Sequence, residues 1–395
     1  MVPKGWQEIH LGDVVSHKKG FAFNSGSYKN QGIRIVRISD TTRNSIHSEN
    51  PVYLCEQDAL GLEQYILGEN DILLSTVGSR PHLLDSMVGK AVKVPVDAAG
   101  SLLNQNLVKL IPKETLITNE YLYEMLKNNR FIFFISTLVR GNANQVSITL
   151  AELFKYQLVL PSLPEQKKIA QILSTWDKAI SITEQLLANS QQQKKALMQQ
   201  LLTGKKRLLD NNGVRFSGEW KSNHLKKLLQ ISKGNQLNKD TLSKSGEYAV
   251  INGGIEPSGY TSEYNTEANT ITISEGGNSC GFVGFKSTRF WCGGHCYAIK
   301  NLKIDLNFTY QLLKFNQSKI MRLRVGSGLP NIQKKDLEEL SVDYPISQEE
   351  QQKIAAVLTT TDKGITALQQ KLDALKQEKK ALMQQLLTGK RRVKV

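Results

Sequence analysis

The sequence predicts an α+β protein in which two mixed α/β domains are separated by a long antiparallel two-helix coiled coil, with a pseudo-two-fold internal repeat. Three observations predict this fold. A stretch of 43 residues occurs twice, each copy shows the apolar spacing of a coiled coil, and the segments before the two copies share an outline. A chain of 395 residues is also too long for a single core.

The repeat covers 165–207 and 350–392. The first copy begins EQKKIAQILSTWDKAI and the second EQQKIAAVLTTTDKGI, and both continue to KKALMQQLLTGK near their ends. With a constant offset of 185 and no gap, about 26 of 43 positions are identical. Identity at this level indicates a duplication within the chain.

Both copies predict helices with a heptad seam, interrupted by a lysine at the same place, Lys194 and Lys379. A Ser-x-x-Glu capping box, Ser162 to Glu165 and Ser347 to Glu350, precedes each helix, and Gly204 and Gly389 fit left-handed caps at the ends. At 1.5 Å per residue each helix extends roughly 55 Å. The expected seam residues are Ile169, Leu173, Trp176, Ile180, Leu187, Leu197, Leu201, Ile354, Leu358, Ile365, Leu368, Leu372, Leu375, Leu382 and Leu386.

Chain connectivity gives the direction of pairing. The first helix leaves the first domain, and a short linker then leads into the second domain, so the second helix has to run back to pair with the first. We therefore expect an antiparallel pair with one domain at each end. The predicted boundaries are 1–161 for the first domain, 162–204 for the first helix, 205–219 for the linker, 220–346 for the second domain, 347–389 for the second helix and 390–395 for a basic tail.

The two domains share a framework. Each opens with a tryptophan, a leucine and a glycine at equal spacing, and each has a β-type run (71–75 and 270–274), a later strand (107–111 and 297–300) and then a helix (near 119–126 and 307–313). Asn119 and Asn307 fit the helix caps. Segments 28–43 and 79–100 of the first domain have no clear counterpart in the second, which favours one scaffold with two different loop surfaces.

Composition and charge narrow the class of protein. The chain is 40% hydrophobic and 22% charged, without a membrane-length apolar run or a signal peptide, and its four cysteines form no disulfide framework, so we expect a cytoplasmic protein. The net charge is +15, and the two repeated stretches supply most of the excess. A basic stretch can follow a phosphate backbone or meet an acidic partner, although many such stretches are only solvated helix faces.

Catalytic signatures are missing. The chain has no phosphate-binding loop, no HExxH, no CxxC and no Asn/Asp-Pro-Pro-aromatic tetrapeptide of the kind that adenine methylation uses. Cys280, Cys292, His295 and Cys296 have poor spacing for zinc, and buried thiols beside a strand turn are the favoured interpretation. The sequence therefore predicts no catalytic and no metal-binding residue.

Polar loop residues are the better candidates, because Arg and Lys donate to guanine edges while Asn and Gln pair with adenine. Each of them taken singly fits an ordinary surface residue better than a DNA contact, and the sequence does not separate base contacts from phosphate contacts. The candidates are Lys18, Lys19, Ser79, Arg80, Arg140, Asn142, Asn144 and Gln145 in the first domain, and Lys233, Asn235, Gln236, Asn278, Ser279, Arg324, Ser327 and Asn331 in the second.

The order domain, helix, domain, helix resembles the specificity subunits of type I restriction–modification enzymes. The residues that carry the resemblance are the run Pro161-Ser162-Leu163-Pro164-Glu165-Gln166, the KKALMQQLLTGK stretches at 194–205 and 379–390, and the segment 272–297 with GFVGF and FWCGGHCY. The second helix lacks the second proline of the first, in Pro345-Ile-Ser-Gln-Glu-Glu.

The resemblance implies that the two domains are target recognition domains, each reading one half of an asymmetric, bipartite site on double-stranded DNA. It also implies that the helices fix the spacer and dock two methyltransferase subunits, which bind S-adenosylmethionine, and that restriction subunits join with ATP and Mg²⁺. This chain would then hold no cofactor and perform no catalysis. The alternatives are a self-contained DNA methyltransferase or nuclease, which the missing motifs disfavour, and a coiled-coil scaffold that reads no DNA, which the differing polar loops disfavour.

Overall fold

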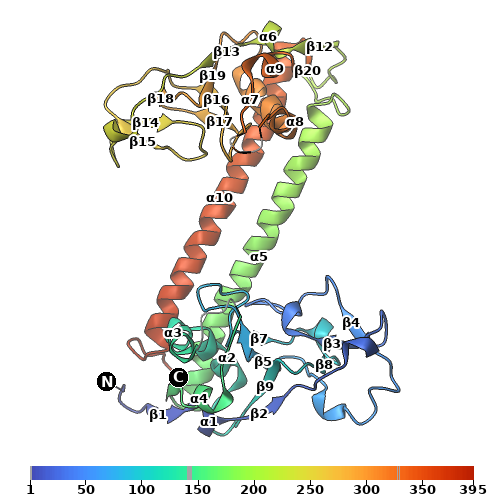
Figure 1. Ribbon diagram of the computed structural model, residues 1–395, viewed down its shortest axis with the longest axis vertical. Helices are drawn as coiled ribbons and strands as arrows, with labels where there is room; N and C mark the ends of the chain where they lie inside the picture. The colour runs from blue at the N-terminus through green and yellow to red at the C-terminus, as the bar shows by residue number, and fades with distance from the viewer. Residues whose placement is uncertain (1, 140–144, 327, 329) are drawn as a thin grey trace. The chain divides into compact units, whose positions relative to one another are not determined.

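The computed structural model describes residues 2–139, 145–326, 328 and 330–395. The chain divides into two compact units. Unit 1 comprises 1–182 and 372–395, and unit 2 comprises 183–371 (Figure 1). Each unit therefore contains one mixed α/β domain together with part of each long helix, α5 (Leu163–Leu201) and α10 (Gln348–Leu386).

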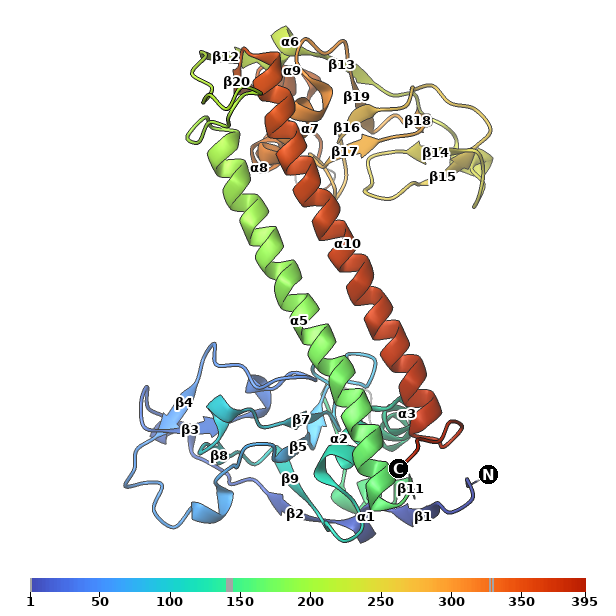
Figure 2. The ribbon, with the colours of Figure 1, turned by 180° about the vertical axis from the view of Figure 1, so that it is seen from behind.

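Unit 1 contains three main sheets. A four-stranded sheet has the order β2-β9-β5-β7, a three-stranded sheet has the order β4-β3-β8, and β1 pairs with β11 (Figure 2). A further two-stranded pair joins β6 (Val77–Gly78) to β10 (Val146–Ser147). The strand bounds are β1 Gln7–His10, β2 Val15–Lys19, β3 Ile33–Val36, β4 Val52–Leu54, β5 Ile72–Ser75, β7 Ala91–Lys93, β8 Leu102–Leu103, β9 Leu107–Pro112 and β11 Gln157–Leu160.

Unit 2 repeats the topology of the three main sheets strand for strand, whereas the β6–β10 pair has only an isolated bridge, Gly276 with Asn331, as its counterpart among the described residues. Its four-stranded sheet has the order β13-β19-β16-β17, its three-stranded sheet the order β15-β14-β18, and β12 pairs with β20. Even the mixed pairing is retained, because β3 is antiparallel to β4 and parallel to β8, as β14 is to β15 and β18. The bounds are β12 Trp220–His224, β13 Gln230–Lys233, β14 Tyr248–Ile251, β15 Gly259–Thr261, β16 Thr270–Ser274, β17 Val283–Lys286, β18 Phe290–Cys292, β19 Cys296–Lys300 and β20 Ser341–Pro345.

The main core of each unit lies between the four-stranded sheet, the short helices and the ends of the long helices. In unit 1 Tyr121 and Phe131 are fully buried with Ile169 of α5 and Leu386 of α10. In unit 2 Phe308 and Ile354 are buried in the corresponding core. The shorter α-helices are α1 Leu11–Val14, α2 Asn119–Lys127, α3 Asn129–Leu138, α4 Leu150–Leu153, α6 Leu225–Leu228, α7 Leu306–Phe315, α8 Gln317–Arg322 and α9 Lys334–Glu338.

The long helices run antiparallel within each unit, as the sequence predicts. In unit 1, Lys379 Nζ lies 2.5 Å from Asp177 Oδ2, and Arg392 contacts Glu165, so residue numbers fall along one helix as they rise along the other. Unit 2 has the equivalent pairs, in which Lys194 Nζ lies 2.5 Å from Asp362 Oδ1 and Arg207 contacts Glu350. The two pairs of contacts are related by the same offset of 185 that relates the sequence repeats.

The fifteen seam residues proposed from the sequence are all buried or half-buried. The lysines that interrupt the seam are partnered rather than solvated, and Lys379 is itself buried. Gly204 and Gly389 have φ values of 69° and 68°, which confirms the left-handed caps. None of the helices in the described part of the chain combines the length and apolarity that a bilayer-spanning segment requires.

The capping-box prediction is only half correct. Ser347 Oγ accepts a hydrogen bond from Glu350 N (3.3 Å), as a capping box requires. The carboxylates of Glu165 and Glu350, however, do not turn back to their own helix starts. They bind Arg392 and Arg207, because a buried carboxylate gains more from a guanidinium than from one backbone N–H.

Two further predictions are wrong. The N-caps of α2 and α7 are Thr118 and Asp305, whose side chains accept from the backbone N–H three residues on, whereas Asn119 lies inside its helix. Segments 28–43 and 79–100 do have counterparts, because they contain β3 and β7, which match β14 and β17 in pairing. These strands have four residues or fewer, and surrounding loops of unequal length hide such short strands from sequence comparison.

Candidate nucleic-acid interface

The polar candidates that the structure describes collect in both domains near the amino-terminal end of a central strand, β9 in the first domain and β19 in the second. Gly20, after Lys19, donates its backbone N–H to Leu107 O at this end of β9 (3.0 Å), and Thr76 donates to Asn106 O (3.1 Å). In the second domain Gly234, after Lys233, donates to Cys296 O (2.9 Å). The two scaffolds thus present their variable loops at the same edge.

Gly20 and Gly234 are required by close backbone contact. A Cβ on Gly20 would lie 2.0 Å from Asn104 O, and one on Gly234 would lie 2.3 Å from Cys292 O. No side chain fits in either place without moving backbone. The glycines therefore hold the lysine loops against the neighbouring chain segment in each domain.

In the first domain the structure brings several candidates together. The register of β6 with β10 pairs Gly78 with Val146, which places Ser79 beside Gln145. Ser79 Oγ lies 2.7 Å from Ser86 Oγ, and Lys18 contacts Gln64 and lies over the ring of Tyr65. The candidates Arg140, Asn142 and Asn144 lie outside the described residues. Lys19 and Gln145 are exposed and Arg80 is half-buried.

In the second domain three loops carry the candidates. Asn235 is tied to the loop around Cys292 by its backbone N–H and accepts a hydrogen bond from Trp291 Nε1 (2.8 Å), while Gln236 beside it is exposed. Asn331 pairs with both Gly276 and Val325, so the loop that bears Asn278 and Ser279 is joined to the loop after Arg324.

The second-domain candidates differ in how exposed their side chains are. Asn278 and Arg324 are exposed, Ser279 is half-buried, and Asn331 Oδ1 accepts from Gln333 Nε2 (2.9 Å). Ser327 lies outside the described residues.

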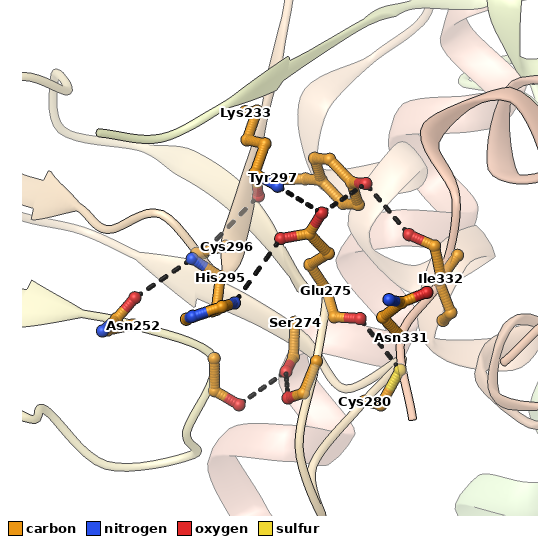
Figure 3. A network of polar contacts seen from close by, with 12 residues as sticks. Lys233, Asn252, Ser274, Glu275, Cys280, His295, Cys296, Tyr297, Asn331 and Ile332 are labelled. Atoms are coloured by element: carbon orange, nitrogen blue, oxygen red, sulfur yellow. Dashed lines mark hydrogen bonds and ion pairs between the residues drawn. The ribbon is translucent and has the colours of Figure 1, made fainter. Parts of the chain in front are cut away.

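Sequence reasoning missed the residue at the centre of this second cluster, Glu275. Its carboxylate accepts hydrogen bonds from Lys233 Nζ (2.6 Å) and Tyr297 OH (3.1 Å) and faces His295 (Figure 3). Tyr297 OH also lies 2.9 Å from Ile332 O, and burial beside Glu275 raises the Tyr297 pKa. The sequence signal that could have identified Glu275 is its position directly after a fully buried strand, β16. The loop that follows Lys233 lies at the same edge of the sheet.

The three cysteines of the second domain, Cys280, Cys292 and Cys296, are buried free thiols. Cys280 Sγ donates to Glu275 O (3.0 Å), and Cys292 Sγ lies 3.5 Å from Cys296 O. Burial raises the pKa of Cys280, and the hydrogen bond with Cys292 together with burial raises the pKa of Cys296, so both thiols stay protonated. Among the described residues no three metal-ligating side chains come together.

Fold and loops together define an internally duplicated protein in which one repeated scaffold, followed each time by a long helix, presents two different polar loop surfaces. The family model described as "Type I restriction modification DNA specificity domain" matches residues 3–189 and 217–377, and the chain belongs to this family.

Relatives and solved structures agree with this assignment. A putative type I restriction enzyme specificity subunit from Methanocaldococcus jannaschii is 27% identical over 415 residues, covering 100% of this chain and 95% of the relative. Putative type I specificity subunits from Mycoplasma genitalium and Mycoplasma pneumoniae are 34% and 36% identical, but the alignments span only 41% and 42% of their lengths. The crystal structure of a type I restriction-modification S subunit from M. genitalium matches 96% of each chain with a TM-score of 0.69 at 17% identity, which shows the shared fold.

Proposed function

We propose that this chain is the DNA-reading specificity subunit of a type I restriction–modification enzyme. Each domain reads one half of an asymmetric, bipartite site on double-stranded DNA. The single observation that carries the proposal is the repeated scaffold with unlike loops: the same edge presents Lys19, Ser79 and Gln145 in one domain and Lys233, Asn278 and Asn331 in the other. Two domains with the same fold but different exposed side chains can recognise two different half-sequences.

The long helices serve assembly in this proposal. They set the gap between the half-sites and dock two methyltransferase subunits, which bring S-adenosylmethionine, and restriction subunits join with ATP and Mg²⁺. The chain itself is non-catalytic and cytoplasmic, and it holds no cofactor. In support, the thiols of Cys280 and Cys292, the buried carboxylates of Glu165 and Glu350 and the buried lysines Lys90 and Lys379 have partners within the fold.

Methylation mapping tests the proposal. The full chain is co-expressed with the modification subunits of its own system in a host without other adenine methylation, and methylated adenines are mapped across the genome. We expect one motif of two unlike half-sequences at a fixed gap. A continuous motif, or methylation unaffected by removal of this chain, contradicts the proposal.

A second assay addresses the alternative of a self-contained enzyme. The purified chain alone is incubated with DNA and labelled S-adenosylmethionine. We expect no transfer of label, whereas transfer without partners would establish a methyltransferase instead. The same preparation with its partners provides the positive control.

A further inference from the structure

Two exposed basic side chains flank one nearly buried carboxylate in the second domain. Lys233 ends β13, His295 precedes β19, and Glu275 follows β16, so three neighbouring strands place them together (Figure 3). The side chains of Lys233 and His295 are 54% and 63% exposed, whereas that of Glu275 is 12% exposed. The carboxylate therefore lies behind the two basic groups.

The position of Glu275 is fixed by its backbone. Its N–H donates to His295 O (2.9 Å), and its carbonyl accepts from Ile332 N (2.8 Å) and from Cys280 Sγ (3.0 Å). His295 N in turn donates to Asn252 Oδ1 (3.0 Å). A residue held by this many bonds keeps its side chain in one place, which is the condition for orienting its neighbours.

The carboxylate oxygens divide between the two basic groups. Oε1 accepts from Lys233 Nζ, and Oε2 is buried, has no hydrogen-bond partner among the described residues and lies 3.8 Å from His295 Nδ1. An ammonium has three donors, so Lys233 keeps two for another acceptor. A carboxylate facing Nδ1 favours the proton on that nitrogen and leaves Nε2 for a ligand.

The first domain lacks this arrangement. Thr76 occupies the position of Glu275, because it follows β5 and its carbonyl accepts from Ile148 N (3.0 Å), as that of Glu275 accepts from Ile332 N. The lysine that matches Lys233 is Lys19, and within the described residues no carboxylate pairs with it. One lysine is thus oriented by a buried anion, and the other has no such constraint.

We propose that Glu275 is a positioning residue for sequence discrimination: it holds Lys233 and His295 as an oriented pair that reads a guanine-containing base pair in the half-site of the second domain. This rests on the proposed function. A lysine with a fixed ammonium can donate to guanine O6 and N7, which identify the base in the major groove. A lysine without such a support, as Lys19 is, acts as a point charge toward phosphate, which carries no sequence information.

Selection from a randomised DNA duplex library tests the proposal. The full chain, in complex with its modification subunits, is compared with Lys233→Ala, Glu275→Gln, Glu275→Thr and His295→Ala, and with Lys19→Ala as the matched control. We expect Lys233→Ala to reduce the preference for one base pair by ~10- to 100-fold. Glu275→Gln, Glu275→Thr and His295→Ala should broaden the same half-site, while the half-site of the first domain stays unchanged and reports correct folding.

The control should behave differently. Lys19→Ala should weaken all sequences by a similar factor and reduce the salt dependence of binding by about one counterion. The proposal is overturned if the Glu275 variants leave both half-sites as in the wild type, or if Lys19→Ala removes a single base preference as Lys233→Ala does. Failure of the wild type itself to select a split motif overturns the proposed function as well, so the two failures are distinguishable. Lys233→Ala changes an exposed side chain and keeps the test valid should a Glu275 variant fold poorly.

Discussion

The two helix–domain junctions share one geometry but satisfy their charges differently. In unit 1 the buried carboxylate of Glu165 binds Arg392 and also accepts from Trp6 Nε1 (3.2 Å). In unit 2 Glu350 binds Arg207, and Trp220 Nε1 is buried without a hydrogen-bond partner among the described residues. The duplicated scaffold has therefore kept the glutamate–arginine ion pair at both junctions. The hydrogen bond from tryptophan to that glutamate is present only in unit 1.

The largest expected effect concerns these arginines. Arg207→Ala leaves the fully buried Glu350 carboxylate without a cation, which should cost about 3–5 kcal/mol of unit 2 stability. Arg392→Ala should cost unit 1 less, because Glu165 keeps the Trp6 hydrogen bond and Arg392 is half-exposed. Hydrogen exchange resolved by peptide measures each unit separately. Equal losses of stability in the two units would contradict the expected difference between Arg207→Ala and Arg392→Ala.

A second pair of junction contacts differs in charge. Lys379 lies between Asp177 and the buried Glu124 (3.4 Å), whereas its counterpart Lys194 binds Asp362, which also accepts from the neutral Gln311 (2.9 Å). Burial raises the pKa of Glu124, against the opposing effect of Lys379. The junction of unit 1 thus contains the buried carboxyl group of Glu124, where the junction of unit 2 has the amide of Gln311.

This difference predicts unequal tolerance of lysine removal. Lys379→Met should destabilise unit 1 by about 3 kcal/mol, because Glu124 loses its cation. Lys194→Met should cost unit 2 about 1 kcal/mol, since Asp362 is partly exposed and keeps Gln311. Urea unfolding followed in each unit provides the measurement, and a larger loss for Lys194→Met would contradict this explanation.

A third difference between the units, a buried lysine in unit 1 where unit 2 has a phenylalanine, predicts that the stability of unit 1 depends on pH. Lys90 is buried and donates to Thr41 O (2.5 Å) and Asp85 O (2.9 Å), while Phe282 holds the equivalent place in unit 2. Burial lowers the pKa of Lys90 to about 8, below the unfolded value of 10.5. The folded state therefore loses its proton first, and wild-type stability should rise relative to Lys90→Met by about 2 kcal/mol between pH 8 and 10. A flat difference across this range would show that Lys90 is not desolvated.

The smallest expected effect separates the two tryptophans. Trp6→Phe removes a donor to Glu165 and should cost about 1 kcal/mol more than Trp220→Phe, which removes an unpaired buried donor. Thermal unfolding of the two variants compares them. A greater loss for Trp220→Phe would mean that its ring packing outweighs hydrogen bonding.

The sequence predicted what periodicity and repetition encode. Heptad spacing and the 185-residue offset predicted two paired helices, chain connectivity predicted their antiparallel direction, and short β-type runs predicted β5, β9, β16 and β19. Short strands such as β3 and β7 carry no such period and were missed. Glu275 was missed for another reason: it follows β16, whereas its partner Lys233 ends β13 and its partners His295 and Tyr297 lie at the start of β19, so only the fold brings them together.

The central claim is that each domain reads its own half-sequence and that the paired helices set the gap. One heptad inserted after Asn189 and one after Ala374, at matched positions of α5 and α10, lengthens each helix by ~10.5 Å and preserves the seam. Methylation mapping of this variant should return both half-sequences unchanged, with a gap wider by up to about three base pairs. An unchanged gap with altered half-sequences would contradict the claim.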